Sequence, residues 1–145
     1  MKRIEGWESL LNDFIKSRYN NRFEWGQHDC FLFVCDGIEA ITGEDPAYMF
    51  RTKYTDKTGA YKLLKDFASG GLEETAGKLA KEFEMTEVAK TFATRGDIAL
   101  CNVPTAISEA LPTLGIIGLN DKIYIAGTRR LQIFDKDVGV RFWKV

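Results

Sequence analysis

The feature that most constrains the fold is a change of pattern near Met85, which divides the sequence into a helical half and a strand half. Before it, apolar residues recur three and four positions apart, as on one buried face of a helix. After it, short apolar and aromatic runs alternate with turn signals. Helices followed by an antiparallel cluster of strands are typical of α+β folds. Because the sequence contains no repeat, low-complexity tract or linker, we expect a single α+β domain over residues 1–145.

The best-defined predicted element is a helix that begins at Asp29 or Cys30 and ends at Thr42. Asp29 is a good N-cap, and Gly43 stands where a C′ glycine stops a helix. The expected buried stripe of this helix is Phe31, Val34, Ile38 and Ile41, and that of an earlier helix ending near Arg18 is Trp7, Leu10, Leu11, Phe14 and Ile15. Two further helices are predicted over residues 58–67 and 72–83, and strands over residues 97–103, 114–119, 122–126, 131–134 and 140–145.

Charge and hydropathy exclude two classes of partner. The net charge of −1 gives no electrostatic footprint for nucleic acid or for an anionic membrane surface. No stretch approaches the roughly 20 apolar residues of a membrane helix, and the charged amino terminus is unlike a secretory signal. Three cysteines, an odd and small number, indicate reduced thiols and synthesis in the cytosol rather than a disulfide scaffold.

Cys30 is the candidate nucleophile because it opens the predicted helix. A thiol attacks only as a thiolate, and the ordinary thiol pKa of about 8.5 keeps it mostly protonated at neutral pH. The positive end of a helix dipole or a neighbouring imidazolium lowers that pKa, and free N–H groups of the first turn can hold an oxyanion. The alternative is that Cys30 is a small buried apolar residue, which is the commoner fate of a lone cysteine.

The run Phe-Glu-Trp-Gly-Gln-His-Asp-Cys at residues 23–30, followed by an apolar helix, resembles the nucleophile segment of NlpC-like, papain-like cysteine hydrolases. Downstream, residues 95–100 are similar to the Gly-Asp strand of that family, and residues 113–126 to its next two strands. The resemblance implies a papain-like fold in which the N-terminal helices, the Cys helix among them, pack on a C-terminal antiparallel sheet. It also implies that Trp25 and Gly26 lie beside the cleft.

More narrowly, the chain resembles a branch of small phage and prophage proteins associated with tail genes. The shared features are the Trp-Gly-x-x-Asp-Cys start, a Thr-Gly-x-Asp-Pro turn at residues 42–46, the Gly-Asp strand and an aromatic-rich last strand at residues 141–145. This resemblance implies a protein made in the host cytoplasm and assembled into the virion tail. Its partners would be other tail proteins and, if it cleaves a bond, peptidoglycan.

The base of a cysteine hydrolase is missing from the position where this resemblance would place it. In the NlpC pattern a histidine opens the strand after the Gly-Asp strand, and the matching residue here is Thr113. The third polar group would come from the following strand, which offers only Tyr124, Ile125 and Ala126. Threonine does not act as a general base near neutral pH, and isoleucine does not orient one. The usual triad is therefore absent, and Thr113 is expected only to bind in the cleft.

His28 is the only histidine of the chain, and its role is open between two arrangements. With Asp29 and Cys30 on the helix, His28 faces away from the thiol, which favours a hydrogen bond within the loop or a place in an exposed entrance. A bent loop would instead form an unusual Cys30–His28 pair with Asp29 behind it. The spacing of His28 and the cysteines matches no metal scheme, so we expect neither a metal nor another cofactor.

Three functions fit these observations. The first is a phage or prophage tail-tip protein that keeps the hydrolase fold and Cys30, lacks the base, and acts in assembly or attachment. The second is an active hydrolase that uses Cys30 to cleave peptidoglycan stem peptides. The third is a cytosolic thiol-containing domain with no link to phage. Outside the cysteine region, Arg129 and Arg130 are interpreted as a solvated turn or as a contact for an acidic partner.

Overall fold

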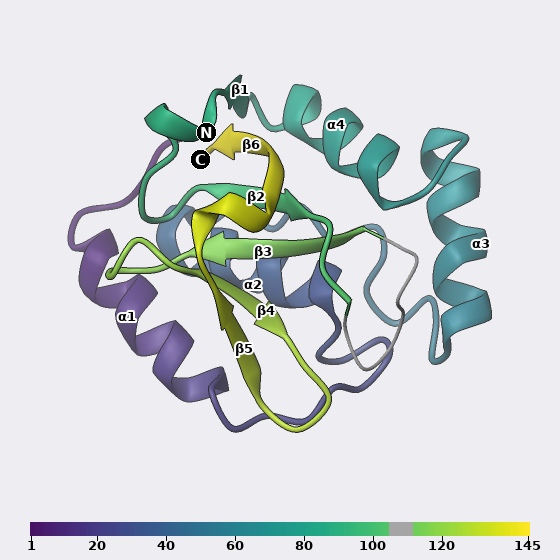
Figure 1. Cartoon of the computed structure of the whole chain (residues 1–145). Helices are drawn as coiled ribbons and strands as arrows, with labels where there is room; N and C mark the ends of the chain where they lie inside the picture. Colours follow the sequence, from purple (N-terminus) through teal and green to yellow (C-terminus); the bar gives the residue numbers. More distant parts are fainter. Residues whose placement is uncertain (105–111) are drawn as a thin grey trace.

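Four helices pack against a six-stranded antiparallel sheet in the computed structural model of the chain, which describes residues 1–104 and 112–145 (Figure 1). This arrangement confirms the predicted α+β class. The helices are α1 (Trp7–Arg18), α2 (Cys30–Thr42), α3 (Lys57–Ala68) and α4 (Leu72–Glu82), and the strands are β1 (Thr86–Val88), β2 (Ile98–Cys101), β3 (Thr113–Ile117), β4 (Ile123–Ala126), β5 (Leu131–Phe134) and β6 (Gly139–Lys144). Two 3₁₀ helices, η1 (Lys90–Phe92) and η2 (Lys136–Val138), lie between strands.

Every predicted helix and strand is present, but β1 and the two 3₁₀ helices are additional. β1 has only three residues, all exposed or half-buried, so it carries no alternation of apolar and polar side chains for a sequence pattern to detect. The predicted buried stripe of α1 is wrong at Leu10, which is 38% exposed. Only one side of α1 packs against α2, and Leu11, Phe14 and Ile15 are the buried residues on it.

The strands follow the order β1-β6-β2-β3-β4-β5, so the last strand of the chain lies inside the sheet. β6 pairs with β1 on one side and with β2 on the other. β3 pairs with β2 and β4, and its first residue, Thr113, pairs with Cys101. This register places Thr113 at the end of an interior strand, where it can face the start of a helix.

α2 is the central helix, and it packs against both α1 and β3. Its ends are those predicted, with Asp29 as the N-cap and Gly43 at φ 80° as the C-cap. Burial extends well beyond the predicted stripe, because layers on several sides cover the helix. Gly37 allows the close contact with β3, since a Cβ atom there would lie 2.8 Å from Ile116 Cδ1.

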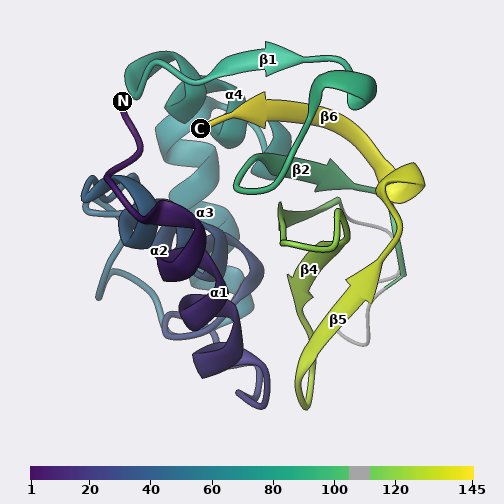
Figure 2. The ribbon, with the colours of Figure 1, turned by 90° about the vertical axis from the view of Figure 1, so that its left-hand side faces the viewer.

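The sheet buries apolar side chains on both faces (Figure 2). Along β2, Ile98 and Leu100 belong to the core under the helices, whereas Ala99 and Cys101 belong to a second core on the opposite face. Figure 2 shows the helices on one side of the sheet, which curves away from them so that β5 and β6 enclose that opposite face. Burial on both faces explains why the strands read as continuous apolar runs.

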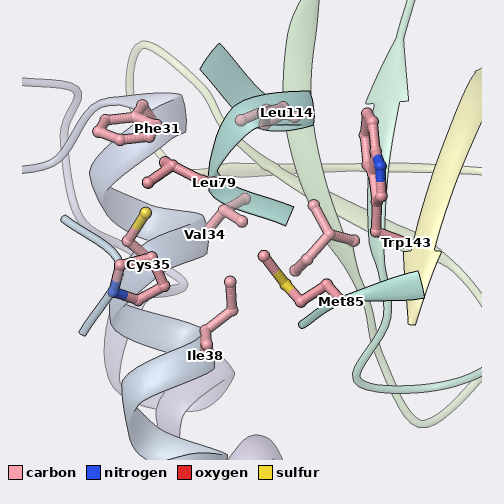
Figure 3. A pocket seen from close by; sticks show the side chains of 11 residues that line it. Phe31, Val34, Cys35, Ile38, Leu79, Met85, Leu114 and Trp143 are labelled. Atoms are coloured by element: carbon pink, nitrogen blue, oxygen red, sulfur yellow. The ribbon is translucent and has the colours of Figure 1, made fainter. Parts of the chain in front are cut away.

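A small hollow remains in the main core between α2, α4 and the sheet (Figure 3). Val34, Cys35 and Ile38 of α2 line one side, Trp143 of β6 lies across from them, and Leu79 of α4 also lines the hollow. Its solvent-accessible space is about 20 Å³, close to the size of one water molecule. Because its lining is apolar, a water would find no hydrogen-bond partner there, and we expect the hollow to be dry.

The Gly-Asp pair before β2 ties both ends of the chain to the sheet. The buried Asp97 carboxylate accepts hydrogen bonds from the Arg3 guanidinium at 2.7 Å and from the Val145 N–H at 3.2 Å. Arg3 also donates to the carbonyl oxygens of Arg95 and Val145. Gly96, at φ 89°, leaves room for this guanidinium, since a Cβ atom there would lie 3.0 Å from it. Asp97 therefore has a structural function in this fold.

Candidate functional site at Cys30

Asp29 holds the loop and helix that position Cys30. Its buried carboxylate accepts hydrogen bonds from the Leu32 N–H at 2.8 Å, from the Gly26 N–H at 3.0 Å and from the Tyr54 hydroxyl. Burial, followed by the Asp29 charge, raises the pKa of Tyr54 far above its usual value, so the phenol stays protonated and donates. Asp29 is thus occupied by structural hydrogen bonds rather than directed at an imidazole.

Gly26 has a conformational role in the same loop. Its φ of 80° lies in the left-handed region, and a Cβ atom at this position would lie 2.2 Å from the Tyr54 carbonyl oxygen. Any other residue would push the loop away from Tyr54 and weaken the hydrogen bonds to Asp29. The resemblance implied that Gly26 lies beside the cleft. In the structure, Gly26 fixes the conformation of the loop that contains Trp25.

The Cys30 thiol lies half-buried at the start of α2, close to the first residues of β3. Burial raises its pKa above the ordinary value, and the Asp29 charge adds to this rise. The Thr113 hydroxyl and the backbones of Leu114 and Phe31 act in the opposite direction by hydrogen bonding. Since these three groups lower the thiol pKa, they are donors that favour the thiolate. The net rise leaves Cys30 protonated at neutral pH.

A pocket lined mainly by apolar and aromatic side chains opens beside Cys30. Trp25 and Tyr61 lie in its wall with their ring centroids 6.3 Å apart. Its solvent-accessible space is about 40 Å³, room for about three water molecules. The other residues of the lining are Asp29, Phe31, Tyr54, Ala60, Leu64, Leu72 and Pro112. Among the described residues of this wall, the only ionisable side chains besides Cys30 are Asp29, Tyr54 and Tyr61.

His28 lies on another side of the loop, away from the thiol. Its side chain is 5% exposed and packs edge-on against Phe33 with ring centroids 5.6 Å apart. Neither ring nitrogen has a hydrogen-bond partner among the described residues. Burial and the Arg18 charge lower its pKa, so the imidazole is neutral at neutral pH. The backbone of His28, not its imidazole, makes the loop hydrogen bonds, through paired contacts with Glu24.

Trp25 therefore shares a pocket wall with Cys30, Thr113 acts on the thiol from the start of β3, and His28 is not among the described residues that line this pocket. The expectation of an exposed or hydrogen-bonded imidazole is wrong, because the residue is buried, the ring packs against Phe33 and its nitrogens have no partner among the described residues. Within residues 1–104 and 112–145, no three metal-ligand side chains gather closely enough to hold an ion. In the same ranges, no helix has the length and apolar character needed to cross a membrane.

Sequence reasoning missed the residues that complete the site from α3 and its preceding loop. Tyr54 reaches Asp29, and Tyr61 faces Trp25 across the pocket. Neither stands in a motif, and both are more than twenty positions from Cys30, so only the fold reveals them. The one local signal in the sequence was an aromatic residue, Tyr61, near the start of the helix predicted over residues 58–67.

Two searches, one of curated proteins and one of solved structures, give no match to the chain. A family model described as a domain of unknown function, DUF6950, matches residues 2–145. Because the match spans nearly the whole sequence, the chain belongs to the DUF6950 family.

Proposed function

We propose that the chain is an NlpC-like, papain-like domain of a phage or prophage tail tip that has kept the nucleophile but lost hydrolytic activity. It acts in tail assembly or in attachment to the cell, and its partners are other tail proteins. The support comes from the placement of Cys30, from its neighbours and from the sequence features shared with tail-associated proteins.

The order of the shared motifs agrees with their arrangement in space. Cys30 is the first residue of α2, and Thr113 is the first residue of β3, which packs against α2. The Gly-Asp pair directly precedes β2, the neighbour of β3 in the sheet. An NlpC-like site has the same requirements, a nucleophile at a helix start and a base at the start of an adjacent strand.

The observation that carries the proposal is that Thr113, at the start of β3, is the side chain whose hydroxyl lowers the pKa of the Cys30 thiol. In the NlpC pattern a histidine at this position would take the thiol proton. A threonine hydroxyl at neutral pH donates to a sulfur atom but does not take its proton. The only histidine of the chain does not bond to Cys30, and burial raises the thiol pKa. These findings favour a site that binds over a site that reacts.

The test is a comparison of two changes in a prophage that encodes this chain. Deletion of the gene is expected to stop the production of infectious particles, because a tail-tip component would be missing. Cys30→Ala is expected to leave the titre of infectious particles unchanged, because the thiol takes part in no reaction. A normal titre after deletion would contradict the role in the tail, and loss of the titre with a folded Cys30→Ala protein would contradict the loss of hydrolysis.

One observation favours the second candidate, an active peptidoglycan hydrolase. The backbones of Phe31 and Leu114 lower the pKa of the Cys30 thiol, and N–H groups that favour a thiolate also stabilise an oxyanion. This candidate predicts that the purified protein solubilises cell-wall fragments and that Cys30→Ala does not. We expect no difference between the two proteins in release of soluble fragments from purified cell wall.

A further inference from the structure

Two loops that lie far apart in the sequence meet at one end of the molecule. The segment between α1 and α2 contacts the turn between β4 and β5 (Figures 1 and 2). The Phe23 N–H donates to the Thr128 carbonyl oxygen at 3.2 Å, and the Leu131 N–H donates to the Tyr19 carbonyl oxygen at 2.9 Å. These two bonds run the segments side by side in opposite directions. They bring Arg22 next to the turn that carries Arg129 and Arg130.

The three arginines form an exposed group without ion pairs in the described part of the chain. Arg22, Arg129 and Arg130 are all exposed, and none of them takes part in a salt bridge there. Of the other arginines, Arg3, Arg18, Arg51 and Arg141 each pair with a carboxylate, whereas Arg95 is exposed and in no salt bridge with a described residue. Residues 19–24 and 127–131 together contain these three arginines and one carboxylate, that of Glu24, which gives a local charge of +2. The chain as a whole has a net charge of −1.

We propose that this arginine cluster (Arg22, Arg129 and Arg130) is a docking surface for an acidic segment of a partner protein. The planar guanidinium group binds a carboxylate through two parallel hydrogen bonds, which makes arginine suited to such contacts. The side-chain amides of Asn20 and Asn21, also exposed, supply further donors between the two loops.

A protein partner fits this surface better than a nucleic acid. Three arginines would neutralise only a few phosphates, and nucleic-acid binding draws its affinity from many such contacts. The net charge of −1 also provides no wider positive field that would hold a polyanion beyond the cluster. An acidic protein segment needs only a small matching patch, and the opposite charges would speed its association.

The arginine cluster continues toward the Cys30 pocket along one short segment. Phe23, next to Arg22, packs edge-on against Trp25 with ring centroids 4.9 Å apart, and Trp25 lines the pocket. The docking proposal does not depend on the proposed tail function, because it rests on the charges and on the two loop contacts. A partner bound at the arginine cluster would, however, lie near the pocket.

The test uses the full chain and a fluorescent hexaglutamate peptide, with binding followed by fluorescence anisotropy. Wild-type protein should bind the peptide at about 0.02 M salt and more weakly at about 0.15 M, because exposed charges are screened. The R22E/R129E/R130E variant should lose at least about tenfold in affinity, since each exposed pair contributes roughly twofold to threefold. The R22Q/R129Q/R130Q variant, which removes charge without reversing it, should show a smaller loss in the same direction.

A matched control variant distinguishes the effect of losing the arginine cluster from the effect of changing the net charge. K2E/K53E/K62E changes the net charge equally at three exposed lysines outside the cluster, and it should keep its affinity within about threefold. Equal losses in the arginine and lysine variants, or no binding by the wild type, would overturn the proposal. Tighter binding of a single-stranded oligonucleotide than of hexaglutamate would overturn the choice of a protein partner.

Discussion

The Thr113 hydroxyl lowers the pKa of a thiol that burial has already made a weaker acid, so it offsets only part of the cost of forming a thiolate. At the residue scale, the reactivity of Cys30 depends on the balance between burial, which raises the thiol pKa, and nearby donors, which lower it. The start of α2 and the N–H groups near the sulfur favour the charged form, but the pocket wall is mainly apolar and aromatic, and no imidazole is among the described residues that line it. The same position in an NlpC-like enzyme would carry a base instead of a donor.

Replacement of Thr113 tests its contact with the thiol. Thr113→Val removes the hydroxyl with little change in volume, so we expect the apparent pKa of Cys30 to rise by about 0.5 to 1. The measurement is the pH dependence of alkylation of Cys30 followed by mass spectrometry. Thr113→Ser keeps the hydroxyl and serves as the control with an unchanged pKa. An identical profile for Thr113→Val would mean that the hydroxyl does not act on the thiol.

His28 makes the stability of the fold dependent on pH near neutrality. Burial and Arg18 lower its folded-state pKa below the value of about 6.5 expected for the unfolded chain. Between these two values the unfolded state binds more protons than the folded state, so the free energy of unfolding falls as the pH falls below about 6.5. The slope in this window should approach about 1.4 kcal/mol per pH unit.

The variant His28→Phe should remove this pH dependence. Both ring nitrogens lack partners among the described residues, so an apolar ring costs little, less than about 1 kcal/mol at neutral pH. Urea unfolding at a series of pH values between about 5 and about 7.5 measures the slope for both proteins. A wild-type slope of zero, or one that survives in His28→Phe, would show that His28 is not the group responsible.

The sequence predicts individual residues of the site unevenly. Trp25 and Thr113 were predicted as site residues because each stands in a motif with a recognisable order along the chain. Tyr54 and Tyr61 were not, because their contacts depend on how α3 and its loop fold over the start of α2. The position of His28 was open for the same reason, since a turn of the loop decides which way the ring faces.

At the scale of elements, α2 is well defined because its capping residues agree with its apolar pattern. Asp29 and Gly43 set the two ends of the helix, and both were apparent from the sequence. The extent to which α2 is buried was not apparent from the sequence, because a sequence pattern shows one buried face and cannot show that several layers cover a helix. β1 was missed since its pairing with β6, rather than its own composition, makes it a strand.

Asp29 should stabilise the fold more than an ordinary N-cap does. Asp29→Ala removes the cap and also leaves Gly26 N–H and the Tyr54 hydroxyl without an acceptor, so we expect a loss of about 3 kcal/mol in the free energy of unfolding. The control is Asp56→Ala at the exposed N-cap of α3, whose carboxylate accepts from Gly59 N–H, with an expected loss of about 1 kcal/mol. Equal losses in denaturant titrations would contradict the role of Asp29 as an anchor of the loop.

At the scale of the whole molecule, two cores on opposite faces of one sheet hold the Cys30 site between helices and strands. The order of helices and strands predicted this class of fold, but strand order could not be read from the sequence. The insertion of β6 between β1 and β2 depends on contacts between the end of the chain and Asp97, which a local pattern does not report.

The hollow in the main core offers a test of how these layers pack. Val34→Ile adds one methylene group toward this space, and we expect it to raise the free energy of unfolding by about 0.5 to 1 kcal/mol. Val103→Ile adds the same methylene group in the second core, away from this hollow, and should be neutral or destabilising. Thermal or urea unfolding of the two variants gives the comparison, and stabilisation by both or by neither would show that the hollow is not the cause.

The central claim is that Cys30 is a retained nucleophile without activation, and the pH profile of its alkylation tests this most directly. Cys35 and Cys101 are buried, and burial raises the pKa of Cys101 to about 12, so iodoacetamide should label Cys30 first. We expect a rate at about pH 6.5 no faster than that of free cysteine, and a rise that continues above the ordinary thiol pKa of about 8.5. A profile that has already reached its plateau at about pH 6.5 would mean an activated thiolate and would contradict the claim.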